Sequence, residues 1–126
     1  MARVLIVDDD AEFRAALLQV MQRLGHEAEA VADGQAAMAA HRSSPADVVF
    51  MDMFMPEHDG LESIRQFRRA FPAAAIIGMS GGGVIDRGTV LDIARQLGAA
   101  RTLEKPFGRE EARAALAAVL GERGTP

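Results

Sequence analysis

Acidic side chains directly follow apolar runs at two points in this chain. Asp8 and Asp9 come after the run at 4–7, and Asp52 follows the run at 48–51. Runs of about four to eight apolar residues bounded by turn signals are typical of buried strands. We therefore expect carboxylates at two strand ends, where they would form a polar site at one edge of a sheet.

Charge crowding restricts what such a site can do. Two like unit charges ~4 Å apart repel by about 4 kcal/mol at an effective dielectric of 20. Three carboxylates in one pocket therefore need bound protons, a cationic partner such as Lys105, or a divalent metal ion. Ligation by oxygen atoms alone, without His or Cys, suits Mg²⁺ or Mn²⁺ before Zn²⁺.

A hydroxyl and a lysine are expected at the same edge. Ser80 directly follows the apolar run at 76–79, and Lys105 with Pro106 follows a short fourth segment. A divalent metal ion beside a free carboxylate, a hydroxyl and a lysine suits the handling of phosphate. The Asp52 oxygen would then be the nucleophile and form an acyl phosphate, while Lys105 and the metal ion neutralise the developing charge.

Alternating strand and helix patterns must position these residues. The first helix is expected between Asp10, as its N-cap, and Gly25, just past its end, with Phe13 and Ala16 on its apolar stripe. Asp33 caps the second helix. In the third helix, Asp59 and Glu62 have the spacing of a capping box. The expected strands are 4–7, 27–31, 48–51, 75–79 and 101–104, and the later helices are 34–43, 60–71, 89–97 and 109–120.

Five strand–helix units imply an α/β fold, in which a parallel sheet is doubly wound with helices on both faces. The runs at 4–7, 48–51 and 75–79 are nearly all apolar, whereas 27–31 and 101–104 carry charges and are expected at the edges. This pattern favours the flavodoxin-like strand order 2-1-3-4-5, with ligands at the carboxyl ends of the strands. One domain is expected at 1–120, followed by a C-terminal tail at 121–126.

Composition excludes several classes of protein. The 126 residues suit one domain, and 14 Lys+Arg against 18 Asp+Glu give a net charge of −4 without the basic stripe that nucleic acid requires. The chain has no Cys for disulfides or thiolate chemistry. Its N-terminus is not a signal peptide, and no apolar run approaches the ~20 residues of a membrane span. We expect a cytoplasmic protein that contacts neither nucleic acid nor membrane.

Several motifs together resemble a two-component response-regulator receiver domain of the chemotaxis-regulator type. They span nearly the whole chain in the family's order, and their joint spacing is far more specific than any one of them. The matching segments are VLIVDDD at 4–10, VADG at 31–34, VVFMDMFMPEHDGLE at 48–62, Ser80 after its strand, and GAARTLEKPF at 98–107.

The resemblance implies a role for each matching residue. Asp52 would accept a phosphoryl group from a sensor histidine kinase or a histidine phosphotransfer protein. Asp9 and the Phe54 carbonyl would ligate Mg²⁺ directly, and Asp8 mainly through water. Ser80 and Lys105 would each contact a phosphoryl oxygen. The Lys105–Pro106 peptide bond would be cis.

Three features depart from the family's pattern. The family's switch aromatic lies three residues before the lysine, where this chain has Thr102, which cannot supply a ring. The stretch after Ser80 is longer than usual and opens with glycines at 81–83, which permit unusual backbone angles and cost entropy to order. Phe54 is bulky where the family tunes dephosphorylation, so we expect it to hinder the attacking water, although the small Gly82 opposes this. An unchanged decay rate in Phe54→Asn would refute the shielding.

The leading hypothesis is a single-domain receiver that signals by changed binding of an unknown downstream protein or by phosphorelay. Its chemistry would be self-catalysed phosphotransfer to Asp52 and autodephosphorylation, without a separate enzymatic output domain. The alternative is a receiver fold used as an unphosphorylated interaction module, which the absence of an aromatic at Thr102 keeps open.

Two rivals from other classes fit less well. A haloacid-dehalogenase-type phosphatase needs a second Asp two residues after its nucleophile, where this chain has Phe54. A flavodoxin-like FMN protein would need a phosphate loop after the first strand, where the acidic run at 8–10 would repel phosphate. The chain also has no Trp or Tyr to stack on a flavin.

Overall fold

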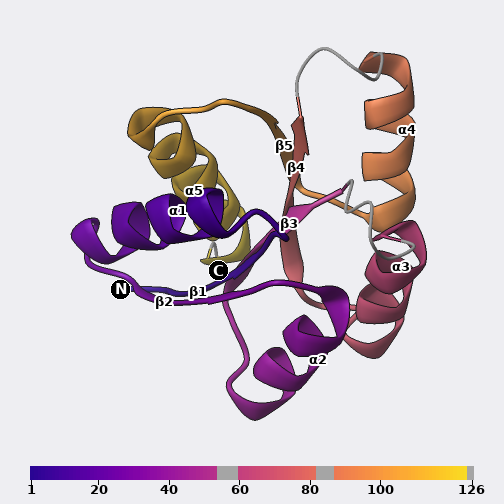
Figure 1. Ribbon diagram of the computed structural model, residues 1–126, viewed down its shortest axis with the longest axis horizontal. Helices are drawn as coiled ribbons and strands as arrows, with labels where there is room; N and C mark the ends of the chain where they lie inside the picture. The colour runs from indigo at the N-terminus through magenta and orange to yellow at the C-terminus, as the bar shows by residue number, and fades with distance from the viewer. Residues whose placement is uncertain (54–59, 82–86, 125–126) are drawn as a thin grey trace.

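In the part of the chain that the structure describes, five strands alternate with five helices. Their arrangement is shown in Figure 1. The computed structural model describes residues 1–53, 60–81 and 87–124. The strands are β1 (Arg3–Val7), β2 (Glu27–Val31), β3 (Val48–Asp52), β4 (Ala75–Gly81) and β5 (Arg101–Lys105). The helices are α1 (Ala11–Arg23), α2 (Gly34–Ser43), α3 (Gly60–Ala70), α4 (Arg87–Leu97) and α5 (Arg109–Gly124).

The strands form one parallel sheet in the order β2-β1-β3-β4-β5, which confirms the predicted topology. The two edge strands carry the charged positions, and all five residues of central β3 are buried. A parallel strand covered on both faces is a nearly continuous apolar run, as β1 and β3 are apart from Arg3 and Asp52 at their ends, whereas an edge strand can carry charges along its length. The polarity of each run therefore separates the two edge strands from the three central strands, and the doubly wound topology orders them.

Helices cover both faces of the sheet, and each face has its own apolar core. On one side, α1 and α5 pack against residues such as Ile6, Phe50 and Ile77. On the other side, α2, α3 and α4 pack against residues such as Val49 and Ile76 (Figure 1). None of the helices in the described ranges is long and apolar enough to cross a bilayer.

Local sequence signals set several helix ends. The Asp10 carboxylate accepts hydrogen bonds from the backbone N–H groups of Glu12 and Phe13 and caps α1, as predicted. Asp33 caps α2 in the same way. Gly25 ends α1 with a φ of 90°, a conformation that glycine adopts without strain.

Three helix predictions differ from the structure. Helix α5 continues to Gly124 rather than ending at 120, because a single glycine lowers helix stability by only about 1 kcal/mol. Helix α4 begins at Arg87, before the predicted start at 89. Ala16, which was expected on the buried stripe of α1, is exposed. The expected capping contact of Asp59 lies outside the described residues.

Candidate functional site

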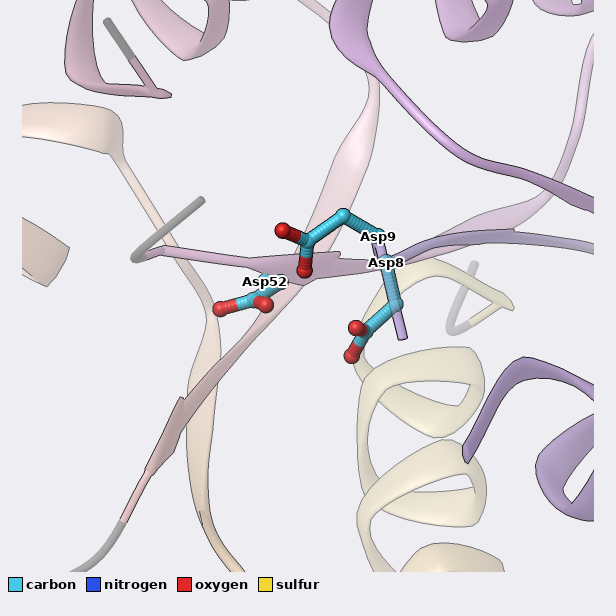
Figure 2. A group of neighbouring side chains, drawn as sticks. All are labelled: Asp8, Asp9 and Asp52. Carbon is cyan, nitrogen blue, oxygen red and sulfur yellow. The ribbon is translucent and has the colours of Figure 1, made fainter. Parts of the chain in front are cut away.

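Three carboxylates gather where β1 and β3 end at the same edge of the sheet. Asp8 and Asp9 directly follow β1, and Asp52 is the last residue of β3. One oxygen atom from each lies within 4.8 Å of the others. Figure 2 shows the three side chains gathered at the strand ends, with the Asp9 side chain extending toward that of Asp52. The sheet order thus brings together residues that are more than forty positions apart in the sequence.

Burial distinguishes the three carboxylates. Asp8 is fully buried and Asp52 is 4% exposed, whereas Asp9 faces solvent. Burying a charged carboxylate is costly unless it is paired or hydrogen-bonded. The site therefore has to hold compensating charge.

Lys105 supplies part of that charge from the end of β5. Its Nζ lies 2.5 Å from Asp8 Oδ2 and 3.6 Å from Asp52 Oδ2. A single ammonium group neutralises at most one of the three carboxylates. The Lys105–Pro106 peptide bond that follows is cis.

Backbone contacts hold Asp8 in one orientation. Its Oδ1 accepts a hydrogen bond from the Asp10 N–H at 2.9 Å, and its own N–H donates to the Val31 carbonyl at 3.1 Å. Arg14 Nη1 donates to the Asp8 carbonyl at 2.9 Å. Each carboxylate oxygen of Asp8 therefore has a partner. Within the described residues, the Asp9 carboxylate makes no such contact, and it is the most available ligand for a metal ion.

Ser80 lies at the same edge of the sheet, in β4. It is 5% exposed and follows Met79, which is in register with Asp52 on β3. Ser80 itself is in register with Glu104, the residue before Lys105. The strands therefore carry the hydroxyl to the end of the sheet where the carboxylates and the lysine meet.

Phe54 and Gly82 lie outside the described residues, so the predicted carbonyl ligand and the predicted shielding stay predictions. Thr102 is exposed on β5, in register with Gly78 on β4. A Cβ atom at Gly78 would lie only 2.7 Å from the Met53 Sδ atom. The thioether of the residue after Asp52 therefore packs directly over a glycine, a contact that the sequence analysis did not predict.

Lys105 also contacts an aromatic ring, and the sequence alone did not indicate this contact. Lys105 Nζ lies over the Phe13 ring, 4.2 Å from its centroid, and Phe107 packs edge-on against the same ring. Phe13 was assigned only to the apolar stripe of α1. One feature of the sequence could have indicated this contact. Phe13 lies three residues after the Asp10 N-cap, in the first turn of α1, and this turn lies next to the end of β1.

Comparisons with known proteins agree with the fold. The sequence matches the family described as "Response regulator receiver domain" over residues 4–117. Response regulator MprA of Mycolicibacterium vanbaalenii is 36% identical over 125 residues, which are 98% of this chain and 52% of that protein. Transcriptional regulatory protein CpxR of Klebsiella pneumoniae is 31% identical over 120 residues, 95% of this chain and 50% of that protein. This chain spans about half the length of these curated relatives.

Solved structures show the same architecture. The Vibrio cholerae chemotaxis protein CheY4 superimposes with a TM-score of 0.83 at 30% identity, covering 95% of this chain and 99% of that one. The receiver domain of NtrX from Brucella abortus also gives a TM-score of 0.83, at 27% identity, covering 93% of this chain and 97% of that one.

Proposed function

The chain belongs to the response regulator receiver domain family, and we propose that Asp52 accepts a phosphoryl group from a phosphohistidine donor in a Mg²⁺-dependent reaction. One observation carries the proposal. Oxygen atoms of Asp8, Asp9 and Asp52 lie within 4.8 Å of one another, and the Lys105 ammonium lies beside two of them. This arrangement has a nucleophile, a metal-ligand set and a cation for phosphoryl oxygens in one pocket.

Asp52 is well placed to act as the nucleophile. It ends a buried strand, and the residue after it donates a backbone hydrogen bond to the Met79 carbonyl at 2.9 Å. In the proposed transfer, an Asp52 oxygen forms a bond to phosphorus as the bond from phosphorus to the donor imidazole nitrogen breaks, and that electron pair leaves with the imidazole. Lys105, 3.6 Å from Asp52 Oδ2, stabilises the charge on the transferred group.

The donor set fits a hard divalent cation. Asp9 and Asp52 would ligate Mg²⁺ directly, with the Phe54 carbonyl as the family's further ligand, and Asp8 would act mainly through water because both its oxygens already have partners. The all-oxygen set supports Mg²⁺ or Mn²⁺ over softer metals. When bound, the ion supplies charge neutralisation and orientation of the phosphoryl oxygens.

Ser80 would donate its hydroxyl to a phosphoryl oxygen, and this contact would link phosphorylation to the β4 end of the sheet. Signalling would follow by changed binding of a downstream protein or by transfer of the group along a phosphorelay. The donor would be a sensor histidine kinase or a histidine phosphotransfer protein. Thr102 has no ring, so the ring movement of other members cannot carry the signal here.

Intact mass spectrometry after incubation with acetyl phosphate and Mg²⁺ tests the proposal, with Asp52→Asn as the matched variant. We expect one added phosphoryl group on the wild type and none on Asp52→Asn, and none on either protein when EDTA replaces Mg²⁺. Equal labelling of the two proteins would contradict the assignment of Asp52.

A second function is favoured by one observation. Thr102 lies exposed on β5 where the family has its switch aromatic, which suits a receiver fold that binds a partner without phosphorylation. This interaction module would be favoured if the wild type takes up no phosphoryl group and binds the same partner as Asp52→Asn does.

A further inference from the structure

We propose that Phe13 is a positioning residue that holds the Lys105 ammonium group at the phosphorylation site. The proposal rests on the proposed function of Asp52 and adds a residue to that site. Lys105 Nζ lies over the face of the Phe13 ring, 4.2 Å from its centroid. An aromatic face attracts a cation through its quadrupole when the cation lies within about 6 Å of the ring centroid.

The ring completes the surroundings of a largely buried ammonium group. The Lys105 side chain is 20% exposed, and its nitrogen contacts Asp8 at 2.5 Å and Asp52 at 3.6 Å. A lysine has three N–H donors. The two carboxylates attract the Lys105 ammonium group toward the strand ends. The Phe13 ring also attracts it, through its quadrupole and without accepting a conventional hydrogen bond. Lys105 can therefore remain in place when its contacts with Asp52 change during phosphoryl transfer.

Several contacts fix the position of the ring. The Phe13 N–H donates to Asp10 Oδ1 at 3.2 Å, so the cap of α1 sets the height of the ring above the strand end. Arg14, the next residue, donates to the Asp8 carbonyl at 2.9 Å and ties the first turn of α1 to β1. Phe107 packs against the ring with centroids 5.5 Å apart and planes at 77°, the edge-to-face arrangement that aromatic pairs favour.

These contacts link the ring to the same segments that build the site. Asp8 and Asp10 belong to the acidic run, and Phe107 lies two residues after Lys105. A residue at position 13 that served packing alone would need only apolar volume. A positioning role requires the aromatic face. Leucine can therefore replace Phe13 in a packing role but not in a positioning role, whereas tyrosine can replace it in a positioning role.

The test compares Phe13→Leu, which keeps apolar volume without the face, with Phe13→Tyr, which keeps the face. The maximal rate and the half-saturating concentration of acetyl phosphate are measured for phosphorylation with Mg²⁺. We expect Phe13→Leu to lower the maximal rate by about threefold to thirtyfold, the range that a face-on ring contact implies. Phe13→Tyr should retain most of the rate.

A double-mutant cycle separates positioning from packing. If Phe13 acts through the lysine, Phe13→Leu should have no further effect on the rate in a Lys105→Met background. The same fractional loss in both backgrounds would overturn the proposal, as would a Phe13→Leu rate equal to the wild-type rate. Melting temperatures of all variants identify any loss due to unfolding.

Proton NMR tests the contact without phosphorylation. The Lys105 ε-methylene protons of the wild type should be shifted upfield by the ring, and Phe13→Leu should remove that shift. Absence of an upfield shift in the wild type would overturn the placement of the lysine. If the shift is present but the wild type takes up no phosphoryl group, the proposed function fails and the positioning role fails with it. If the wild type is phosphorylated and Phe13→Leu matches it, only the role of Phe13 fails.

Discussion

At the scale of single residues, the site is governed by how negative charge is neutralised. Asp8 is fully buried and is neutralised by Lys105, whose nitrogen also lies near Asp52. Removing one partner from a buried ion pair leaves the other charge without compensation and is strongly destabilising. Lys105 and a bound metal ion neutralise the same carboxylates, so Lys105 should lower the affinity of the site for the metal ion.

Lys105→Met tests this coupling. Without Mg²⁺, the free energy of unfolding should fall by about 1–3 kcal/mol, less than for a fully dehydrated pair because the lysine is partly exposed. The variant pocket is more negative, so its affinity for Mg²⁺ should rise by about tenfold or more. Urea unfolding with EDTA and calorimetric titration with Mg²⁺ measure the two quantities. Unchanged Mg²⁺ affinity would show that lysine and metal ion do not share the pocket's charge.

At the scale of helices and strands, the ends of the elements set the positions of the functional groups. Asp10 fixes the first turn of α1 through two backbone hydrogen bonds. Gly78 on β4 leaves space that the Met53 side chain fills. Both contacts lie next to the acidic site, and each can be tested through stability.

Asp10→Ala should lower the free energy of unfolding by about 1 kcal/mol, because two N–H groups of α1 lose their acceptor. Asp33→Ala removes the cap of α2 and is the matched control, with a similar expected loss. Urea denaturation gives both values. An unchanged midpoint for Asp10→Ala, beside a lowered midpoint for Asp33→Ala, would show that the cap of α1 adds nothing.

Gly78→Ala should destabilise the protein by about 1–3 kcal/mol, because its new Cβ would lie 2.7 Å from Met53 Sδ in a closely packed core. Gly81→Ala is the control on the same strand, since a Cβ there has no neighbour within 4 Å. The loss from Gly78→Ala should be smaller when Met53 is also changed to Ala. Equal stability of Gly78→Ala and Gly81→Ala would contradict the described packing.

At the scale of the whole molecule, the topology could be predicted because the polarity of each run reflects how deeply its strand is buried. Charged runs marked the edge strands, the alternation of strands and helices indicated the doubly wound order, and that order placed Asp8 beside Asp52. The contacts of Lys105 with the Phe13 ring and of Met53 with Gly78 could not be predicted. They join distant segments, and they depend on side-chain directions that no local pattern encodes.

Binding of Mg²⁺ should stabilise the whole fold. A ligand that binds only the native state adds RT ln(1 + [L]/Kd), which is about 2.7 kcal/mol at a hundredfold excess over Kd. The melting temperature of the wild type should therefore rise by several degrees with saturating Mg²⁺. Asp9→Asn should lose most of this rise, because Asp9 is the most available ligand. A rise of the same size in both proteins would place the metal ion elsewhere.

The central claim is that Asp52 forms the acyl phosphate, and reductive trapping tests it most directly. Borohydride converts an aspartyl phosphate to homoserine, which peptide mapping by mass spectrometry locates in the chain. After incubation with acetyl phosphate and Mg²⁺, the account predicts homoserine at position 52 and none there when EDTA is present. Homoserine at position 8 or 9, or no homoserine in a protein that binds Mg²⁺, would contradict it.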